Sequence, residues 1–255
     1  MATNGGPKIP QQNLKVYLDV NNPDCSGITS PSTGLTDNLR LYNLIVNDDI
    51  EYFYNDQNTE AYQDAVLHKS SFVLRHNALD GSTKRDTTWR ANTGLTRVNS
   101  YTFISWFKFD NSGQQSENIY GGGFDGRTSF YMSPSGTSSS HGVLNYSDAG
   151  GTNGYSTVSN HGANDGNWHM RAYTVTGPDV GVQTTKFYVD GVLKQTNTSN
   201  SSHDNPDGSN TMRWGSWTGG YGNLAGDLNH FIYYERVLSD SEILNIYNIT
   251  KTKYQ

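Results

Sequence analysis

The stretch Thr185-Lys-Phe-Tyr-Val-Asp-Gly-Val-Leu-Lys194 decides the fold class of this chain. An apolar-rich run, Phe187 to Val189, is followed by Asp190-Gly191, and a second apolar pair, Val192-Leu193, comes next. Asp-Gly between two such runs predicts a β-hairpin, because a type I′ turn needs positive φ at both central residues.

Strand-like segments lie on both sides of this hairpin, at residues 168–175 and 228–234. Residues 101–109 are apolar on both alternating faces and predict a central strand. Residues 14–19 alternate between apolar and polar side chains and predict the first strand. Since no helix pattern interrupts these strands, the sequence predicts an all-β, two-sheet antiparallel fold.

The segments between these strands are richer in turn-forming residues. Residues 21–31 predict a loop. Strand-like pieces at 39–46, 50–54 and 71–74 end in Asn/Asp clusters, and the strand order between residues 30 and 95 stays unassigned. Residues 110–166 combine short strands such as 129–132 with loops rich in Gly, Ser and Asn.

One short helix is predicted near the C-terminus. Ser239-Asp-Ser-Glu242 has the pattern of a capping box, in which the Ser hydroxyl and the Glu carboxylate each accept from a backbone N–H. Leu238 and Ile243 occupy the positions of a hydrophobic staple. We expect a helix from Asp240 to about Asn248 that lies on one edge of the sandwich.

Composition limits the classes of function. The 255 residues carry a net charge of −6 and only 16% charged side chains, with 17 Tyr and 27 Gly. Because Lys and Arg form no cluster, nucleic acid is not expected as a partner. No apolar run approaches the roughly 18 residues of a membrane span. The single cysteine, Cys25, forbids a disulfide within the chain and fits assembly in a reducing cytoplasm.

The N-terminal segment is polar and contains Gly5-Gly6, Pro7 and Pro10. It lacks the apolar core of a signal peptide. Residues 1–13 are therefore expected to form an extended arm, either disordered or ordered on a neighbouring subunit, and residues 14–255 a single domain.

Four segments together resemble the concanavalin-A-like jelly roll of laminin-G-like and pentraxin-like domains: 101–108, 167–174, 186–193 and 226–243. The resemblance implies a jelly-roll sandwich with a short C-terminal helix. Residues 16–23 resemble the opening of a subgroup found among virion proteins of tailed bacteriophages. Residues 30–95 match this pattern poorly, and the fold hosts lectins, glycanases and scaffolding proteins alike.

The sequence argues against catalysis. The glycanases of this fold resemble one another in a Glu-x-Asp-x-(x)-Glu strand, whereas no two of the five glutamates here are four or five residues apart. Gly121-Gly-Gly-Phe-Asp-Gly126 satisfies G-x-G-x-x-G, but a strand pattern and not a helix follows it, so we expect this segment to be a loop. His169 and His230 lie in predicted strands, where a structural, hydrogen-bonded histidine is expected. His161 and His203 lie in loops and give no metal-site spacing.

Calcium is a cofactor that the resemblance raises, because lectins and pentraxins of this fold often hold it on rim loops. The loop carboxylates available for it are Asp125, Asp204 and Asp207. No segment has the D-x-[DN]-x-[DN]-G order, and Asp in Gly-rich loops also serves to form turns. We therefore predict no cofactor, with calcium as the alternative.

Carbohydrate is the ligand that the residues themselves favour. Gly215-Ser-Trp-Thr-Gly-Gly-Tyr-Gly-Asn223 places Trp217, Tyr221 and Asn223 in a glycine-rich segment between two strands. Aromatic faces beside amide groups suit sugar rings, which offer C–H faces and hydroxyls. The alternative is that Trp217 folds back over the sheet edge.

Two hypotheses follow from the sequence. The first is a non-enzymatic structural protein of a tailed-bacteriophage virion, a capsid decoration or exterior appendage that docks through residues 1–13 on capsid or other virion proteins. The second is a lectin-like, carbohydrate-binding module that adheres to host or environmental polysaccharide. The sequence gives neither the oligomeric state nor the glycan.

Overall fold

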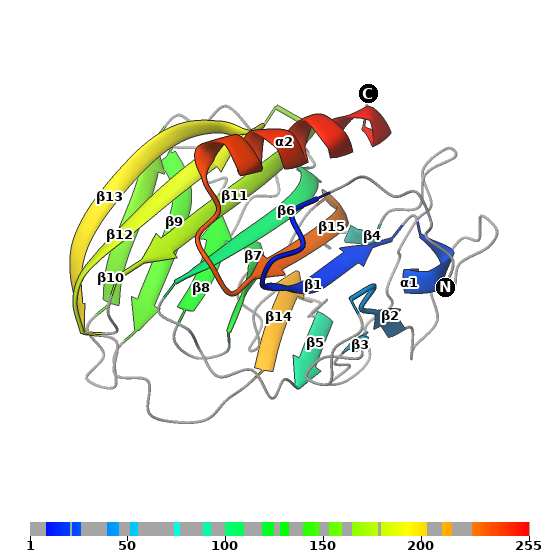
Figure 1. The fold of residues 1–255 in the computed structure, drawn as a ribbon, viewed down its shortest axis with the longest axis horizontal. Coiled ribbons are helices and arrows are strands. Elements are labelled where there is room, and N and C mark those ends of the chain that lie inside the picture. The colour runs from blue at the N-terminus through cyan, green and yellow to red at the C-terminus, as the bar shows by residue number, and fades with distance from the viewer. Residues whose placement is uncertain are drawn as a thin grey trace, which may run out of the picture.

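The computed structural model describes residues 9–20, 22–26, 40–45, 52–55, 74–76, 89–92, 100–109, 119–124, 128–132, 140–147, 153–159, 165–177, 180–202, 211–215 and 226–254. Within these residues two antiparallel sheets face one another, and a helix covers the outer side of one of them (Figure 1). The predicted all-β sandwich with a short C-terminal helix is confirmed.

The first sheet has seven strands. Its order is β1 (Leu14–Asp19), β15 (Gly226–Tyr234), β6 (Tyr101–Phe109), β11 (Trp168–Thr176), β12 (Val180–Val189) and β13 (Val192–Ser202), while β4 (Leu74–His76) pairs with β15. β6 lies between β15 and β11, as expected for a strand that is apolar on both faces.

The second sheet has eight strands. Its order is β10 (Asn153–Ser159), β9 (Ser140–Ser147), β8 (Thr128–Met132), β7 (Ile119–Phe124), β14 (Thr211–Gly215), β5 (Trp89–Asn92), β3 (Tyr52–Asn55) and β2 (Arg40–Tyr42). The strand predicted to follow the G-x-G-x-x-G segment is confirmed as β8, but the prediction that the segment itself is a loop is wrong for residues 121–124, which belong to β7.

The β12–β13 hairpin turns at Asp190-Gly191, as predicted. Both residues have positive φ, 52° for Asp190 and 77° for Gly191. A Cβ on Gly191 would lie 3.0 Å from Leu244 Cδ1 and 3.1 Å from Tyr247 Cβ. Glycine is therefore required here twice, by the backbone conformation and by the close approach of the helix.

The helix α2 (Asp240–Thr250) begins with the predicted capping box and packs on the outer face of the seven-stranded sheet (Figure 1). Its buried Ile243 and Ile246 meet a row of buried side chains that share one face of the sheet: Ile104, Trp106, Met170, Ala172, Tyr188, Ile232 and Tyr234. The alternate residues of these strands, such as Phe103 and Tyr173, are buried on the opposite face, where their rings stack at 5.2 Å.

Two local features differ from the sequence expectation. The loop predicted for residues 21–31 contains a one-turn helix, α1 (Pro23–Ser26). Pro23 stands at its first position, where the missing N–H costs nothing, and the Asn22 side chain accepts from Asp24 N at 2.9 Å. Cys25 is buried within it.

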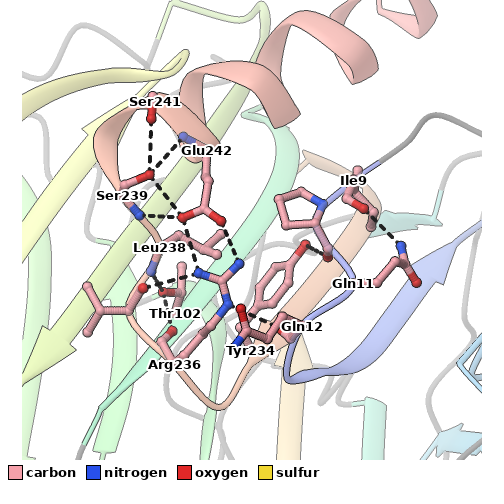
Figure 2. A network of polar contacts seen from close by, with 12 residues as sticks. Ile9, Gln11, Gln12, Thr102, Tyr234, Arg236, Leu238, Ser239, Ser241 and Glu242 are labelled. Atoms are coloured by element: carbon pink, nitrogen blue, oxygen red, sulfur yellow. Dashed lines mark hydrogen bonds and ion pairs between the residues drawn. The ribbon is translucent and has the colours of Figure 1, made fainter.

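Residues 9–13 of the predicted arm pack on the domain itself. Ile9 is 4% exposed, Tyr234 Oη donates to the carbonyl of Pro10 at 2.9 Å, and Arg236 Nε donates to the carbonyl of Gln12 at 2.9 Å. Figure 2 shows that the same Arg236 also reaches Glu242 of the capping box. This arginine therefore joins the N-terminal segment to the start of α2.

Candidate functional site

The residues predicted to bind carbohydrate lie outside the described residues: Trp217, Tyr221 and Asn223. The described strands that flank them belong to different sheets. Gly215, the last residue of β14, pairs with Tyr120 in the eight-stranded sheet. Gly226, the first residue of β15, pairs with Phe109 in the seven-stranded sheet. The chain therefore passes from one sheet to the other between these two strand ends.

The carboxylates considered for calcium also lie outside the described residues: Asp125, Asp204 and Asp207. Asp125 directly follows Phe124, which pairs with Met212 near the start of β14. The Asp204 and Asp207 segment leads into that same start at Thr211. The described residues Phe124 and Thr211 thus lie at one end of the β7–β14 pair, and Gly215 lies at the opposite end of β14. The described part of the chain contains no group of three or more His, Cys, Asp or Glu side chains placed to hold a metal ion.

A cluster of aromatic rings lies on the outer face of the seven-stranded sheet, at the end of α2. The ring of Tyr254 stacks on Trp106, with centroids 4.0 Å apart and planes 15° apart, and tilts against Trp168 at 4.9 Å. Tyr247 stacks on Trp106 at 5.8 Å. Trp106 Nε1 donates to Thr250 Oγ1 at 2.8 Å. Trp106 is buried, whereas Trp168 is only partly buried.

Polar groups adjoin these rings. The Tyr254 hydroxyl is hydrogen-bonded to Nδ1 of His230, a fully buried residue of β15. His230 Nε2 lies 3.3 Å from Asp19 Oδ2 but makes no hydrogen bond of good geometry. Lys253 Nζ contacts the same Asp19 oxygen at 2.5 Å, and Tyr17 stacks over the His230 ring. We call the site formed by Tyr17, Asp19, Trp106, Trp168 and His230 the Tyr254 pocket.

The electrostatics of this pocket favour the neutral form of its histidine. Burial lowers the pKa of His230, and the attraction of Asp19 opposes this shift only in part. Burial would raise the pKa of Asp19, but His230 and Lys253 outweigh it and hold that pKa well below its usual range. Burial raises the pKa of Tyr254 well above its usual value. A neutral imidazole that accepts from Tyr254 at Nδ1 and carries its proton on Nε2, toward Asp19, fits these neighbours.

A second polar cluster lies at the start of β11. His169 Nδ1 is 2.7 Å from Asp190 Oδ2, and His169 Nε2 is 2.9 Å from Asp165 Oδ1. Asp190 also accepts from Met170 N, and Asp165 accepts from both nitrogens of Asn167. Burial lowers the pKa of His169, but the two carboxylates outweigh burial and raise it above the usual value. Below this raised pKa, an imidazolium held from both sides fastens the hairpin turn to β11.

The two histidines in strands thus have the structural, hydrogen-bonded roles that the sequence predicts for them. What the sequence did not indicate is the set of partners, since Asp190 is 21 residues from His169 and Tyr254 is 24 residues from His230. The loop histidines His161 and His203 lie outside the described residues.

No described helix is long and apolar enough to cross a membrane.

Comparison with known proteins identifies the family of this fold. The sequence profile described as the concanavalin A-like lectin/glucanases superfamily matches residues 80–244, more than half of the chain. No curated protein matches this sequence.

Solved structures with a similar fold include three binding domains of botulinum neurotoxins. The serotype D/C binding domain has a TM-score of 0.55 at 12% identity, and the match covers 92% of this chain and 52% of that one. The type G receptor-binding domain has a TM-score of 0.52 at 11% identity, with 93% and 51% covered. A type DC binding domain in complex with rat synaptotagmin II has a TM-score of 0.51 at 10% identity, with 92% and 51% covered.

This chain spans about half of the length of those solved chains. At such low identity the likeness concerns the fold alone. The fold and the matched sequence profile lead to one assignment, and the chain belongs to the concanavalin A-like lectin/glucanases superfamily.

Proposed function

We propose that this protein is a non-catalytic binding domain whose ligand is carbohydrate, with Trp217 and Tyr221 as stacking platforms and Asn223 as a polar contact. The observation that carries the proposal is the position of their segment between Gly215 in one sheet and Gly226 in the other. Connections between the sheets of a sandwich gather at its ends, where binding loops are commonly found. Membership of a superfamily of lectins and glucanases supports the same class of ligand.

The proposal includes the absence of glycan hydrolysis. The five glutamates of the chain are Glu51, Glu60, Glu117, Glu235 and Glu242, and no pair of them has the spacing of the glycanase strand. Glu242 is engaged by Arg236 and by the capping box. Release of reducing sugar from a bound polysaccharide would contradict this part of the proposal.

A glycan array followed by calorimetry tests the binding site. Trp217→Ala should weaken affinity for the glycan about fivefold, because an aromatic contact contributes about 1 kcal/mol beyond its buried area. Tyr42→Ala is the matched control, since Tyr42 is 40% exposed on β2. Equal affinities for wild type and Trp217→Ala would refute the assignment of the site.

A second proposal concerns the assembly to which the domain belongs, a tailed-bacteriophage virion. It rests on the resemblance of residues 16–23 to the opening of virion proteins of tailed bacteriophages. Residues 16–19 of this segment belong to β1. Since residues 9–13 are packed on the domain, residues 1–8 are the part of the arm proposed to dock on virion proteins.

Quantitative mass spectrometry of purified particles tests the virion proposal. A copy number near that of the major capsid protein supports a decoration role, and a few copies per particle support an appendage. Absence from the particles would refute the proposal. Unchanged attachment after deletion of residues 1–8 would refute docking through the arm.

A further inference from the structure

Tyr254 packs between two indole rings and a buried polar pair. Its ring lies against Trp106 and Trp168, and its hydroxyl is bonded to the buried His230 beside Asp19. We propose that the Tyr254 pocket is a binding site for a hexopyranose and that residues 252–254 close it from within the same chain. This inference concerns a different site from Trp217 and does not rest on the function proposed above.

Lys251 is joined to α2, because its N–H donates to the carbonyl of Tyr247 and its Nζ donates to Asn248 Oδ1, so only residues 252–254 would have to move to open the pocket. α2 ends at Thr250, and the Trp106–Thr250 hydrogen bond together with the buried Ile243 and Ile246 holds it on the sheet. The following 3₁₀ turn, η1 (Lys251–Lys253), has no side-chain cap, and the Tyr254 N–H returns only to the carbonyl of Lys251. Withdrawal of residues 252–254 would therefore uncover the pocket without undocking α2.

The chemistry of the pocket suits a pyranose better than a phenol. Two indole faces provide an apolar surface for the C–H face of a sugar ring. The single hydroxyl of Tyr254 bonds only to Nδ1 of His230, and the buried Nε2 faces Asp19 at 3.3 Å without a hydrogen bond of good geometry. A pyranose carries several hydroxyls, which can donate to Asp19 and bond to His230 together.

Closure by residues 252–254 lowers the apparent affinity of this site. A ligand binds only the open fraction of the protein, so its apparent dissociation constant rises by the inverse of that fraction. If about 1% of molecules are open, removal of the Tyr254 ring raises affinity about 100-fold. Lys253→Ala removes the ammonium from Asp19 but keeps the ring, so a gain of about fivefold is expected.

The experiment is calorimetry with the methyl glycosides of glucose, galactose and mannose. One or more of these should bind Tyr254→Ala about 100-fold more tightly than wild type. Tyr254→Phe keeps the closing ring and loses only the hydrogen bond to His230, so its gain in affinity should be far smaller than that of Tyr254→Ala. Thr252→Ala is the matched control, since Thr252 is exposed in the same segment. Lys253→Ala supplies the test if Tyr254→Ala does not fold.

Three outcomes would overturn the proposal. In the first, p-cresol binds Tyr254→Ala and raises its melting temperature, but no glycoside binds this variant. The pocket would then be only the packing site of the Tyr254 ring in the core. In the second, no glycoside binds a folded Tyr254→Ala or Lys253→Ala. In the third, a glycoside binds both variants no better than wild type and is lost in Trp217→Ala, which refutes the pocket and leaves the Trp217 site standing. If Tyr254→Ala still binds the glycoside more tightly than wild type when it is combined with Trp217→Ala, the pocket is supported independently of the Trp217 site.

Discussion

The cluster of His169 with Asp165 and Asp190, here called the His169 clamp, makes the stability of the β12–β13 hairpin depend on pH, and Asp190→Asn tests that dependence. Asn tolerates the positive φ of position 190 and keeps an oxygen for Met170 N. The amide that replaces the second oxygen faces His169 Nδ1, where the protonated ring needs an acceptor. The substitution therefore removes one of the two carboxylate partners of the imidazolium and favours the neutral ring.

The expected cost follows from the contact and its exposure. A hydrogen bond between charged groups contributes about 1.5–3 kcal/mol. The side chains of His169 and Asp190 are 13% and 29% exposed, so screening by solvent reduces this to about 1–2 kcal/mol. The folded-state pKa of His169 is raised, so its contribution is complete below the unfolded value of about 6.5 and is lost as pH rises through the folded value.

Urea unfolding at pH 5.5 and at pH 9 measures the effect. We expect Asp190→Asn to lose about 1–2 kcal/mol at pH 5.5 and clearly less at pH 9. Asp24→Asn, on the exposed side of α1, is the control and should change stability by less than about 0.5 kcal/mol at both values. An equal loss at pH 5.5 and pH 9 would refute the imidazolium clamp. A histidine NMR titration should show a lower pKa for His169 in the variant.

Three further predictions concern α2 and its contacts, each measured by chemical unfolding. Gly191→Ala should cost about 2–4 kcal/mol, since the residue has positive φ and its Cβ would meet Leu244; a loss below 1 kcal/mol would contradict this. Glu242→Ala should cost about 1–2 kcal/mol by loss of the capping box and the arginine pair, and an unchanged midpoint would contradict it. Thr250→Val should cost about 1–3 kcal/mol, because it leaves the buried Trp106 N–H without its acceptor; neutrality would show that the indole finds another.

Local signals predicted the local structure well. The Asp190-Gly191 turn and the Ser239–Glu242 capping box depend on a few adjacent residues, so both were readable from the sequence. The one-turn helix α1 was missed because its proline and asparagine favour turns as well as helix starts. Residues 9–13 were predicted to belong to an extended arm, because their packing on the domain depends on Tyr234 and Arg236, which are distant in the sequence.

The alternation of apolar and polar residues along a strand indicates which side chains share a face. It does not indicate which of the two sheets the strand joins. Accordingly β4 pairs with β15 in one sheet while β3 and β5 belong to the other, an arrangement that residues 30–95 did not reveal. For the same reason the Tyr254 pocket was not predicted, because it unites β1, β6, β11, β15 and the turn after α2. The carbohydrate assignment of Trp217, Tyr221 and Asn223 remains a prediction.

The pairing of β1 with β15 also has a consequence for synthesis on the ribosome. Asp19 pairs with His230, and Leu14 with Tyr234, so the first described strand has its partner roughly 200 residues later. At about 5–20 residues per second, β1 waits some 10–40 s for that partner. During this interval its apolar side chains Leu14, Val16 and Leu18, which are buried in the folded protein, are exposed to other nascent chains. We expect the final closure of this sheet to be slow, because contacts so distant in sequence form late, and chaperone demand during translation to be correspondingly high.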